Sequence, residues 1–323
     1  MIRFIARITL LLAVVAMPAL AQNYPTKQVT LIVPFAAGGP TDTVARQLAQ
    51  VMGKSLNQAV IVENAAGAGG TIAATKLKNA APDGHTLLIA HIGMSTAPAL
   101  YRNLPWNPLE DFEYIGQVVD VPMTIIAKKD LPPNNLKELI AYIKANKDKV
   151  TLANAGLGAA SHLCGLLFMS AIETDLTTVP YKGTAPALND LLGGQVDVMC
   201  DQTTQTTSYI KANRVKAYGV TSKTKVASLP ELAPLADQGL PNFEVVIWHG
   251  IYAPKGTPKP VLDKLVATLQ TSIADPGFVQ RMADLGSQVV PKDKATPEGL
   301  RKHLKAEIDK WTPIIKKAGI YAE

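Results

Sequence analysis

The chain of 323 residues carries a formal net charge of +6 and two cysteines. A chain of this length can bury a large core and usually divides into two domains. Its mild charge, without a dense run of Lys and Arg interleaved with aromatic residues, argues against nucleic acid as a partner. Cys164 and Cys200 are too few for a disulfide framework, and a single bridge between them is left open.

Residues 1–21 have the pattern of a secretory leader. Arg3 and Arg7 flank an apolar run that leads to a small-x-small cleavage site ending at Ala21. The run is shorter than the roughly 20 apolar residues that a membrane span requires. We therefore expect cleavage after Ala21, which removes two arginines and lowers the formal charge from +6 to about +4.

The stretch from Val29 to Thr43 predicts a strand, a loop of small residues and the start of a helix. Its first five residues are apolar or β-branched, as in a strand covered on both faces, and Pro34 should end it because proline cannot donate to a ladder. The small residues before Pro40 let the backbone approach another molecule closely, and Thr41 is an expected helix N-cap. Free backbone N–H groups and a helix dipole meet here, so we expect an anion site.

Alternating strands and helices follow this stretch. A second strand is expected at Ala59–Val62 and a third at Thr86–Ile92. Between them, a second loop of small residues leads to Thr71, where a helix should begin. Strands that alternate with helices indicate an α/β fold with a parallel sheet.

The pattern then changes to two strand-like segments, Tyr114–Val119 and Met123–Ala127, joined by a short link. We place a crossing into a second domain here. The apolar segment Val245–Tyr252 should carry the chain back to the first domain. The expected hinge therefore lies near Val119–Met123 and Val245–Tyr252.

The second half repeats the opening arrangement. Val150–Ala153 indicates a strand, a small-residue loop follows, and Ser161 is an expected helix N-cap. Further on, a helix should begin at Thr184 and a strand should end at Asp201. Two strand–loop–helix units, one in each half, would place two helix N-termini across a cleft. The chain should end in a basic amphipathic helix over Pro297–Lys317.

The glycine loops do not match known phosphate-binding motifs. Neither contains the lysine of the G-x-x-x-x-G-K-[ST] loop. Gly67 and Gly69 fit G-x-G-x-x-G, but Ile72 stands where the third glycine belongs. The five histidines also lack the spacings of zinc motifs, so we expect no cofactor and no metal.

Ser161, His162 and Cys164 keep a secreted hydrolase open as an alternative function. A hydrolase elbow would have the pattern G-x-S-x-G, but Ala159 and Leu163 flank the serine at those positions. Adjacent residues on a helix point in different directions, so Ser161 and His162 are poorly placed to act on each other. We therefore expect no catalytic activity.

Two further polar residues stand at expected strand ends. His91 closes the third strand, where ligands of open α/β sheets gather, and Asp201 closes a later one. Each also has an ordinary reading, His91 as a residue facing solvent and Asp201 as the cap of the next helix. Both readings stay open for both residues.

Five segments together resemble a known family. They are YPTKQVTLIVPFAAGGPTDTVAR, VENAAGAGGTIAA, the SHL of ASHLCGLLF, VPYKGTAPALNDLLGGQVDVM and APKGTP. The mature chain resembles the Bug-type extracytoplasmic solute receptors of tripartite tricarboxylate transporters. The resemblance implies a periplasmic binding protein of the Venus-flytrap type, with two α/β lobes joined by a hinge of crossing strands. Residues 22–120 with 247–323 would form lobe 1, and residues 121–246 lobe 2.

The resemblance also implies a carboxylate ligand that is held by loops of both lobes through backbone amides and ordered water. In lobe 1 the expected ligand-binding residues are Phe35, Ala37, Gly38, Gly39, Thr41, Asp42, Ala66, Gly67, Gly69, His91 and Ser95. In lobe 2 they are Asn154, Gly156, Gly158, Ala159, Ser161, His162, Lys182, Thr184, Asp201 and Thr203. Relatives commonly have a small polar residue at the position of His91 and Phe at that of Cys200, so the identity of the ligand does not carry over.

We therefore expect a monomeric periplasmic receptor that captures an aromatic or aliphatic di- or tricarboxylate and delivers it to the membrane components of a tripartite tricarboxylate transporter. A protein that presents its ligand to a sensor shares the same lobes and stays an alternative. No arginine lies in the expected loops, so the carboxylate should bind without a guanidinium. The ring of His91 suits an aromatic group or a second carboxylate, and an aromatic dicarboxylate would use both features.

Overall fold

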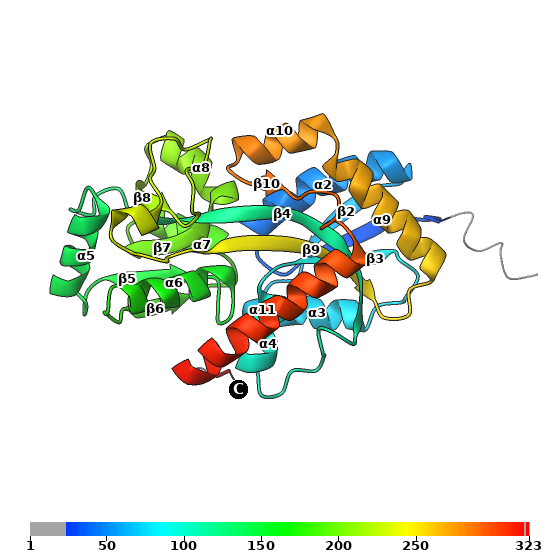
Figure 1. Ribbon diagram of the computed structural model, residues 1–323, viewed down its shortest axis with the longest axis horizontal. Coiled ribbons are helices and arrows are strands. Elements are labelled where there is room, and N and C mark those ends of the chain that lie inside the picture. The colour runs from blue at the N-terminus through cyan, green and yellow to red at the C-terminus, as the bar shows by residue number, and fades with distance from the viewer. Residues whose placement is uncertain (1–23, 320, 323) are drawn as a thin grey trace, which may run out of the picture.

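The computed structural model describes residues 24–319, 321 and 322, so the expected leader lies outside the described part of the chain. Two α/β lobes are joined by two long strands, β4 (Phe112–Ala127) and β9 (Val246–Pro254), which run from one lobe into the other (Figure 1). The expected architecture of two lobes and a hinge of crossing strands is confirmed. Among the described residues, no helix has the length and apolar character to cross a membrane.

The first lobe is built on strands in the order β2-β1-β3-β9-β4. The first three are parallel, and β9 runs antiparallel to β3 and β4. Its other elements are β1 (Val29–Val33), α2 (Pro40–Leu56), β2 (Val60–Asn64), η1 (Ala68–Gly70), α3 (Thr71–Lys78), β3 (Thr86–Ala90), α4 (Gly93–Leu100), α9 (Lys259–Ile273), α10 (Pro276–Asp284), β10 (Gln288–Val289) and α11 (Pro297–Ala318). Leu31, Leu48 and Leu265 form part of its core, between the sheet and helices α2 and α9.

The second lobe continues the sheet in the order β4-β7-β5-β6, with β8 also paired to β4. Its parallel strands β5, β6 and β7 repeat the arrangement of the first lobe. Its elements are α5 (Leu136–Ala145), β5 (Thr151–Asn154), α6 (Ala160–Ala171), β6 (Thr177–Pro180), α7 (Thr184–Leu192), β7 (Val198–Gln202), α8 (Thr203–Lys211), β8 (Lys216–Val220) and η2 (Leu235–Gln238). Cys164 of α6 and Cys200 of β7 form a disulfide in its core, which settles the pairing that the sequence left open.

Two sequence predictions about strands are wrong in detail. The two strands expected between Tyr114 and Ala127 are one strand, because Pro122 lies where β4 changes partner: Pro122 pairs with Val246, the first residue of β9, and the next residue, Met123, pairs with β7. The missing N–H of Pro122 therefore interrupts no ladder. The third strand ends at Ala90, and α4 follows it at once. The sequence did not indicate α4, whose interior contains a helix-breaking Pro98.

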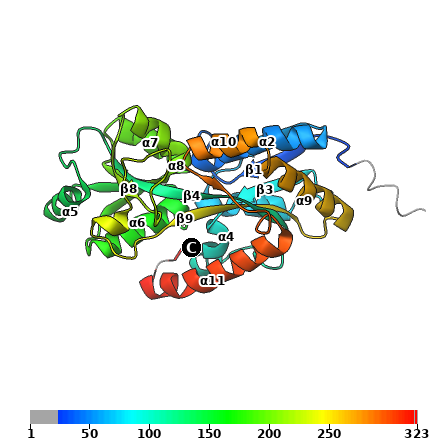
Figure 2. The same ribbon diagram turned by 45° about the horizontal axis from the view of Figure 1, so that its top comes forward.

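The C-terminal helix α11 packs against elements of both lobes. It lies along α4 in both views of the ribbon (Figures 1 and 2). Its Trp311 and Ile315 belong to the same buried cluster as Ile247 of β9 and Leu163 of α6. The expected lobe boundaries, 120/121 and 246/247, both fall inside the crossing strands, and the precise division stays a prediction.

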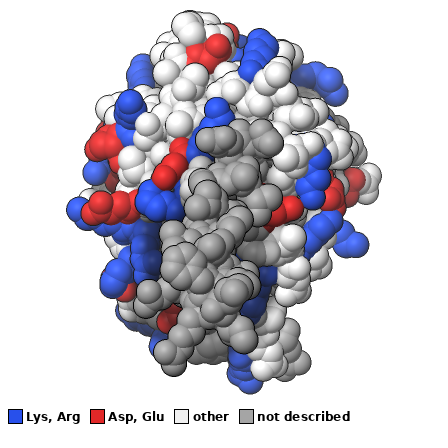
Figure 3. All heavy atoms as spheres, turned by 90° about the vertical axis from the view of Figure 1, so that its right-hand side faces the viewer, with Lys and Arg blue, Asp and Glu red and all other residues white. Residues whose placement is uncertain are grey.

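Charged side chains are mixed on the visible surface. On the face that Figure 3 shows, Lys and Arg are interspersed with Asp and Glu. Exposed ion pairs such as Lys27–Asp83 and Lys259–Asp263 reflect this mixture. Exposed pairs of this kind contribute little to stability, typically about 0–1 kcal/mol each.

Candidate ligand-binding site

The loop between β1 and α2 ends in a helix N-terminus without a side-chain cap. Gly39 is the N-cap, and Pro40 occupies the first helical position, for which its fixed φ and missing N–H are suited. The prediction of Thr41 as N-cap is therefore wrong by two residues. The hydroxyl of Thr41 instead lies 3.3 Å from Nε2 of His249. Because Gly39 has no side chain, the N-cap offers no acceptor to the backbone N–H groups in the first turn of α2.

Asp42 holds the same loop in place. Its carboxylate accepts hydrogen bonds from the Gly38 N–H (2.9 Å), from Nε of Arg46 (2.8 Å) and from Nδ2 of Asn64 (2.9 Å). Burial acts to raise the pKa of Asp42, but these hydrogen bonds outweigh it, so the net pKa is below its ordinary value. Both oxygens of this predicted ligand residue are thus engaged within the lobe, and so is the nearest arginine.

The second loop of the first lobe contacts the second lobe directly. Gly69 has φ +60°, and a Cβ at this position would overlap the carbonyl oxygen of Leu157. A Cβ at Gly156 would lie 3.6 Å from the Gly69 nitrogen. The hydroxyl of Tyr101 donates to the Leu157 oxygen at 3.3 Å. Only glycine permits this approach of two backbones.

The matching loop of the second lobe is stabilised by its own polar side chains. The Ala155 N–H donates to Oγ of Ser161 (2.8 Å), and the Gly158 N–H donates to Nδ1 of His162 (3.3 Å). Asn154 accepts from the Gly156 N–H (2.9 Å) in the same way. The N-cap of α6 is Ala159, so the prediction of Ser161 as N-cap is also wrong. The serine lies inside the first turn and bonds back to the loop instead.

A third helix N-terminus, that of α7, completes the contact between the lobes. Its N-cap is Gly183, which has no side chain, and the helix begins at Thr184 as predicted. The Ala36 N–H of lobe 1 donates to the Lys182 carbonyl of lobe 2 at 3.1 Å. Oγ1 of Thr96 donates to the Gly158 carbonyl, also at 3.1 Å. These contacts show the lobes in a closed arrangement.

Two histidines and an aromatic ring lie under the loops of lobe 1. His91 stacks on Phe35 with ring centroids 5.0 Å apart and an interplanar angle of 7°. His249 meets the His91 ring edge-on at 5.3 Å. Burial lowers the pKa of His91 to about 3 and that of His249 well below its ordinary value. Both rings are therefore neutral at pH 7, and the Nδ1 atom of each has no protein partner.

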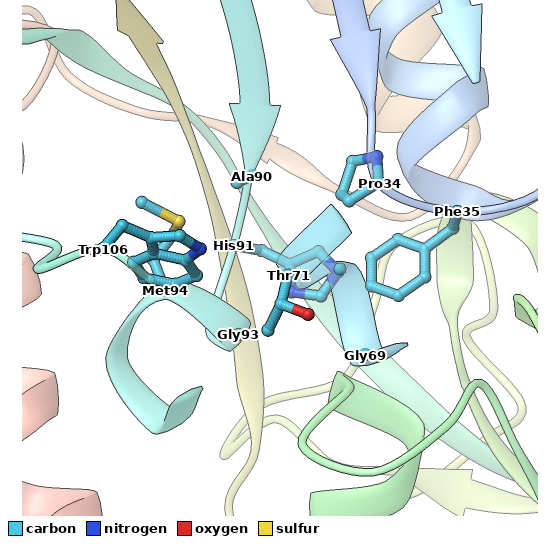
Figure 4. A pocket seen from close by; sticks show the side chains of 10 residues that line it. Pro34, Phe35, Gly69, Thr71, Ala90, His91, Gly93, Met94 and Trp106 are labelled. Carbon is cyan, nitrogen blue, oxygen red and sulfur yellow. The ribbon is translucent and has the colours of Figure 1, made fainter. Parts of the chain in front are cut away.

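His91 faces a small cavity inside lobe 1 (Figure 4). The cavity has a volume of about 20 Å³, enough for about one water molecule. Figure 4 shows the Phe35 ring on one side of His91, with Met94 and Trp106 farther away on the other. The cavity is lined by Pro34, Phe35, Gly69, Gly70, Thr71, Ala90, His91, Gly93, Met94 and Trp106. That His91 touches the ligand itself stays a prediction.

Asp201 lies one residue before the end of β7 and is fully enclosed. Burial raises its pKa to about 7, while the nearby Gln202 backbone and Thr184 hydroxyl act to lower it. Its Oδ2 atom has no protein partner, and neither has Oε1 of Gln202. Buried polar atoms in native proteins are nearly always paired. The two unpaired oxygens therefore indicate a polar site at the end of β7. Whether Asp201 contacts a ligand stays a prediction.

Several residues that shape this region were not predicted from the sequence. Asn64 ties Asp42 to the Phe35 carbonyl, and its only sequence signal is its place at a strand end. His249 was considered only as part of the returning strand and as one of five histidines without the spacing of a zinc motif. Gln205, which accepts a hydrogen bond from Thr184, gave no signal at all.

The hydrolase alternative is not supported by the geometry of its residues. Cys164 is bonded to Cys200, so the free thiol that one form of this alternative requires is not present. Ser161 and His162 bond different backbone groups of one loop. Within residues 24–319, 321 and 322, no group of three or more His, Cys, Asp or Glu is placed to hold a metal ion.

Comparison with known proteins places the chain in a family. Residues 44–320 match the family described as "Tripartite tricarboxylate transporter family receptor". The chain belongs to this family. Family members are periplasmic binding proteins, and the expected resemblance to Bug-type receptors is confirmed.

Three solved structures of this receptor type resemble the chain closely. The periplasmic binding protein BugD is 56% identical with a TM-score of 0.91, and the match covers 93% of this chain and 100% of that one. MatC from Rhodopseudomonas palustris with bound malate is 38% identical with a TM-score of 0.87, and the match covers 90% and 100%. A second R. palustris protein, solved with adipate, is 30% identical with a TM-score of 0.87, and the match covers 92% and 99%.

Proposed function

We propose that this receptor captures an organic carboxylate between its two lobes and delivers it to the membrane components of a tripartite tricarboxylate transporter. One observation carries the proposal: three helix N-termini without side-chain caps meet around the loop of residues 35–39. A Cβ at the α2 N-cap, Gly39, would lie 3.8 Å from Oγ1 of Thr184 in α7. Ala159, the N-cap of α6, packs on Phe35. Backbone N–H groups and dipoles from both lobes therefore point toward one place, which favours an anion.

Three other helices give a contrast, while α3, α4, α8 and α9 also lack a side-chain hydrogen bond at their N-caps. The N-caps of α5, α10 and α11 are Asn135, Asp275 and Thr296, and each accepts a hydrogen bond from a backbone N–H. The N-caps of α2, α6 and α7 are Gly or Ala, which offer no such acceptor. A ligand carboxylate would supply the acceptor that these helices lack.

The binding energy does not require an arginine. A helix N-terminus stabilises an anion by roughly 0.3–1 kcal/mol when exposed and up to about 2 kcal/mol when partly buried. Each hydrogen bond to a charged group adds about 1.5–3 kcal/mol. Four or five such bonds reach the roughly −8 kcal/mol of micromolar binding. A complex with its carboxylate paired to a guanidinium would contradict this proposal.

The surroundings of His91 favour an aliphatic acid over an aromatic one. Phe35 already stacks on the ring, and the edge of His249 contacts it from another direction. Little of the ring is left for stacking with a ligand, since His91 is only 3% exposed. The malate and adipate of the two related structures are aliphatic dicarboxylates, which supports the same choice.

A panel of acids tests the proposal. The purified protein is titrated calorimetrically with malate, adipate, phthalate, an aliphatic monocarboxylate and an acidic amino acid. We expect micromolar binding of at least one aliphatic dicarboxylate and weaker binding of phthalate. NMR of the bound acid over a day should show it unchanged, because the receptor has no catalytic role. The proposal fails if every acid binds more weakly than about 1 mM.

Delivery to a transporter is tested in cells. A strain that lacks the gene for this receptor should lose uptake of the labelled acid, and the plasmid-borne gene should restore it. Unchanged uptake, together with a lost transcriptional response to the acid, would favour the sensor alternative instead.

A further inference from the structure

The disulfide of the second lobe lies between two elements of the proposed ligand site. Cys164 is in the first turns of α6, three residues after Ser161, which holds the loop at Ala155. Cys200 immediately precedes Asp201 in β7. Both cysteines are fully buried in the main core of the lobe. The bond therefore connects the segment that fixes one binding loop to the strand end that carries the buried carboxyl group.

The non-covalent contacts between these two elements are made by side chains of one buried cluster. α6 and β7 face each other through side chains alone, because they share no ladder. The neighbouring strand β5 pairs with β7 at two positions, Leu152 with Val198 and Ala153 with Met199. A Cβ at Gly165 of α6 would lie 2.8 Å from the Leu152 side chain, so helix and sheet are in close contact there. The disulfide is the covalent restraint on their separation.

We propose that the Cys164–Cys200 disulfide is a positioning device for ligand binding. It holds loop 154–159 and the end of β7 at one fixed separation, so that backbone donors of the loop and the Asp201 carboxyl meet the same ligand. Two thiols would pack at van der Waals separation instead of bonding distance, which moves α6 away from β7. A binding site tolerates displacements of only about 0.5 Å. This inference takes its ligand from the proposed function. The effect of the disulfide on the position of the loop does not depend on that function.

The test compares two paired substitutions with a matched control. Cys164→Ala/Cys200→Ala removes the bond and some volume, whereas Cys164→Val/Cys200→Val removes the bond and adds volume, so the two pairs bracket the volume of the disulfide. Leu139→Ala in α5 is the control, because it opens a cavity in the same core away from the site. Hydrogen exchange at residues 155–163 and 201–206 is measured in each protein, together with the dissociation constant for malate and the thermal midpoint.

We expect both cysteine pairs to accelerate exchange at these two segments about ten-fold and to weaken malate binding about ten-fold, the effect of losing one good hydrogen bond to a charged group. Leu139→Ala should lower the thermal midpoint comparably and leave malate affinity within about two-fold. Wild-type exchange and affinity in the valine pair would show that packing alone positions the site, and would overturn the proposal. If wild type does not bind malate, the exchange data still decide the inference, and only the choice of ligand fails.

Discussion

Substitution of Gly69 by Ala should prevent the lobes from closing. A Cβ at this position would fall well under 3.0 Å from the Leu157 carbonyl oxygen, closer than Cβ atoms come to other heavy atoms, and 3.0 Å from the Tyr101 hydroxyl. The oxygen belongs to the backbone of the other lobe and cannot turn away. The two loops must therefore separate by about 1 Å or more, and the clash acts only on the closed form.

The cost follows from the contacts that closure makes. Separation at Gly69 removes the hydrogen bonds from Ala36 to Lys182 and from Thr96 to Gly158, each worth about 0.5–1.5 kcal/mol. The closed form is then destabilised by about 1–3 kcal/mol. Because the ligand binds that form, its affinity should fall roughly 5- to 150-fold, which calorimetric titration measures directly.

A second glycine provides the matched control. Gly194 has φ +75°, similar to Gly69, but a Cβ there would have nothing within 4 Å. Gly194→Ala therefore has only the cost of the left-handed backbone, about 1–2 kcal/mol of folding stability. Its ligand affinity should stay within about two-fold of wild type. If Gly69→Ala also binds with wild-type affinity, the closed arrangement is not the binding form and the reasoning is refuted.

Three further predictions concern stability. The raised pKa of Asp201, about 7, means that its contribution to stability is present below pH 4 and is lost as pH rises toward 7; Asp201→Asn should abolish this loss in urea unfolding. The lowered pKa of His91, about 3, gives the opposite pH dependence: the free energy of unfolding falls as pH drops from 6.5 toward 3. This fall should be smaller in His91→Phe. Loss of the Cys164–Cys200 bond, with a sequence separation of 36, should reduce unfolding free energy by about 4 kcal/mol, measured with denaturant; a loss under about 1 kcal/mol would contradict the loop-entropy argument.

Much of the fold was predictable because its signals are local. The apolar run at Val29–Val33, the small-residue loop after it and the helix that follows depend on neighbouring residues, and the structure has all three. The start of α7 at Thr184 was likewise predicted to the residue. The positions of the crossing strands could be inferred from their apolar segments, since both strands are largely buried, although β4 was expected as two strands.

The site was less predictable because its geometry depends on contacts between distant segments. Thr41 and Ser161 are good N-cap residues by type, yet Gly39 and Ala159 occupy the caps. No local pattern shows that a glycine or alanine will cap a helix whose free N–H groups face another lobe. The surroundings of His91 were also hidden, because Phe35 is 56 positions earlier in the chain and the stacking depends on how the loop returns.

Small-angle scattering with and without a saturating acid tests the central claim most directly. The account holds that an organic carboxylate binds between the lobes and stabilises the closed form. The radius of gyration of wild type should decrease when the acid with the highest affinity in the panel is added, and that of Gly69→Ala should not. An unchanged radius of gyration in wild type at saturation would contradict the account.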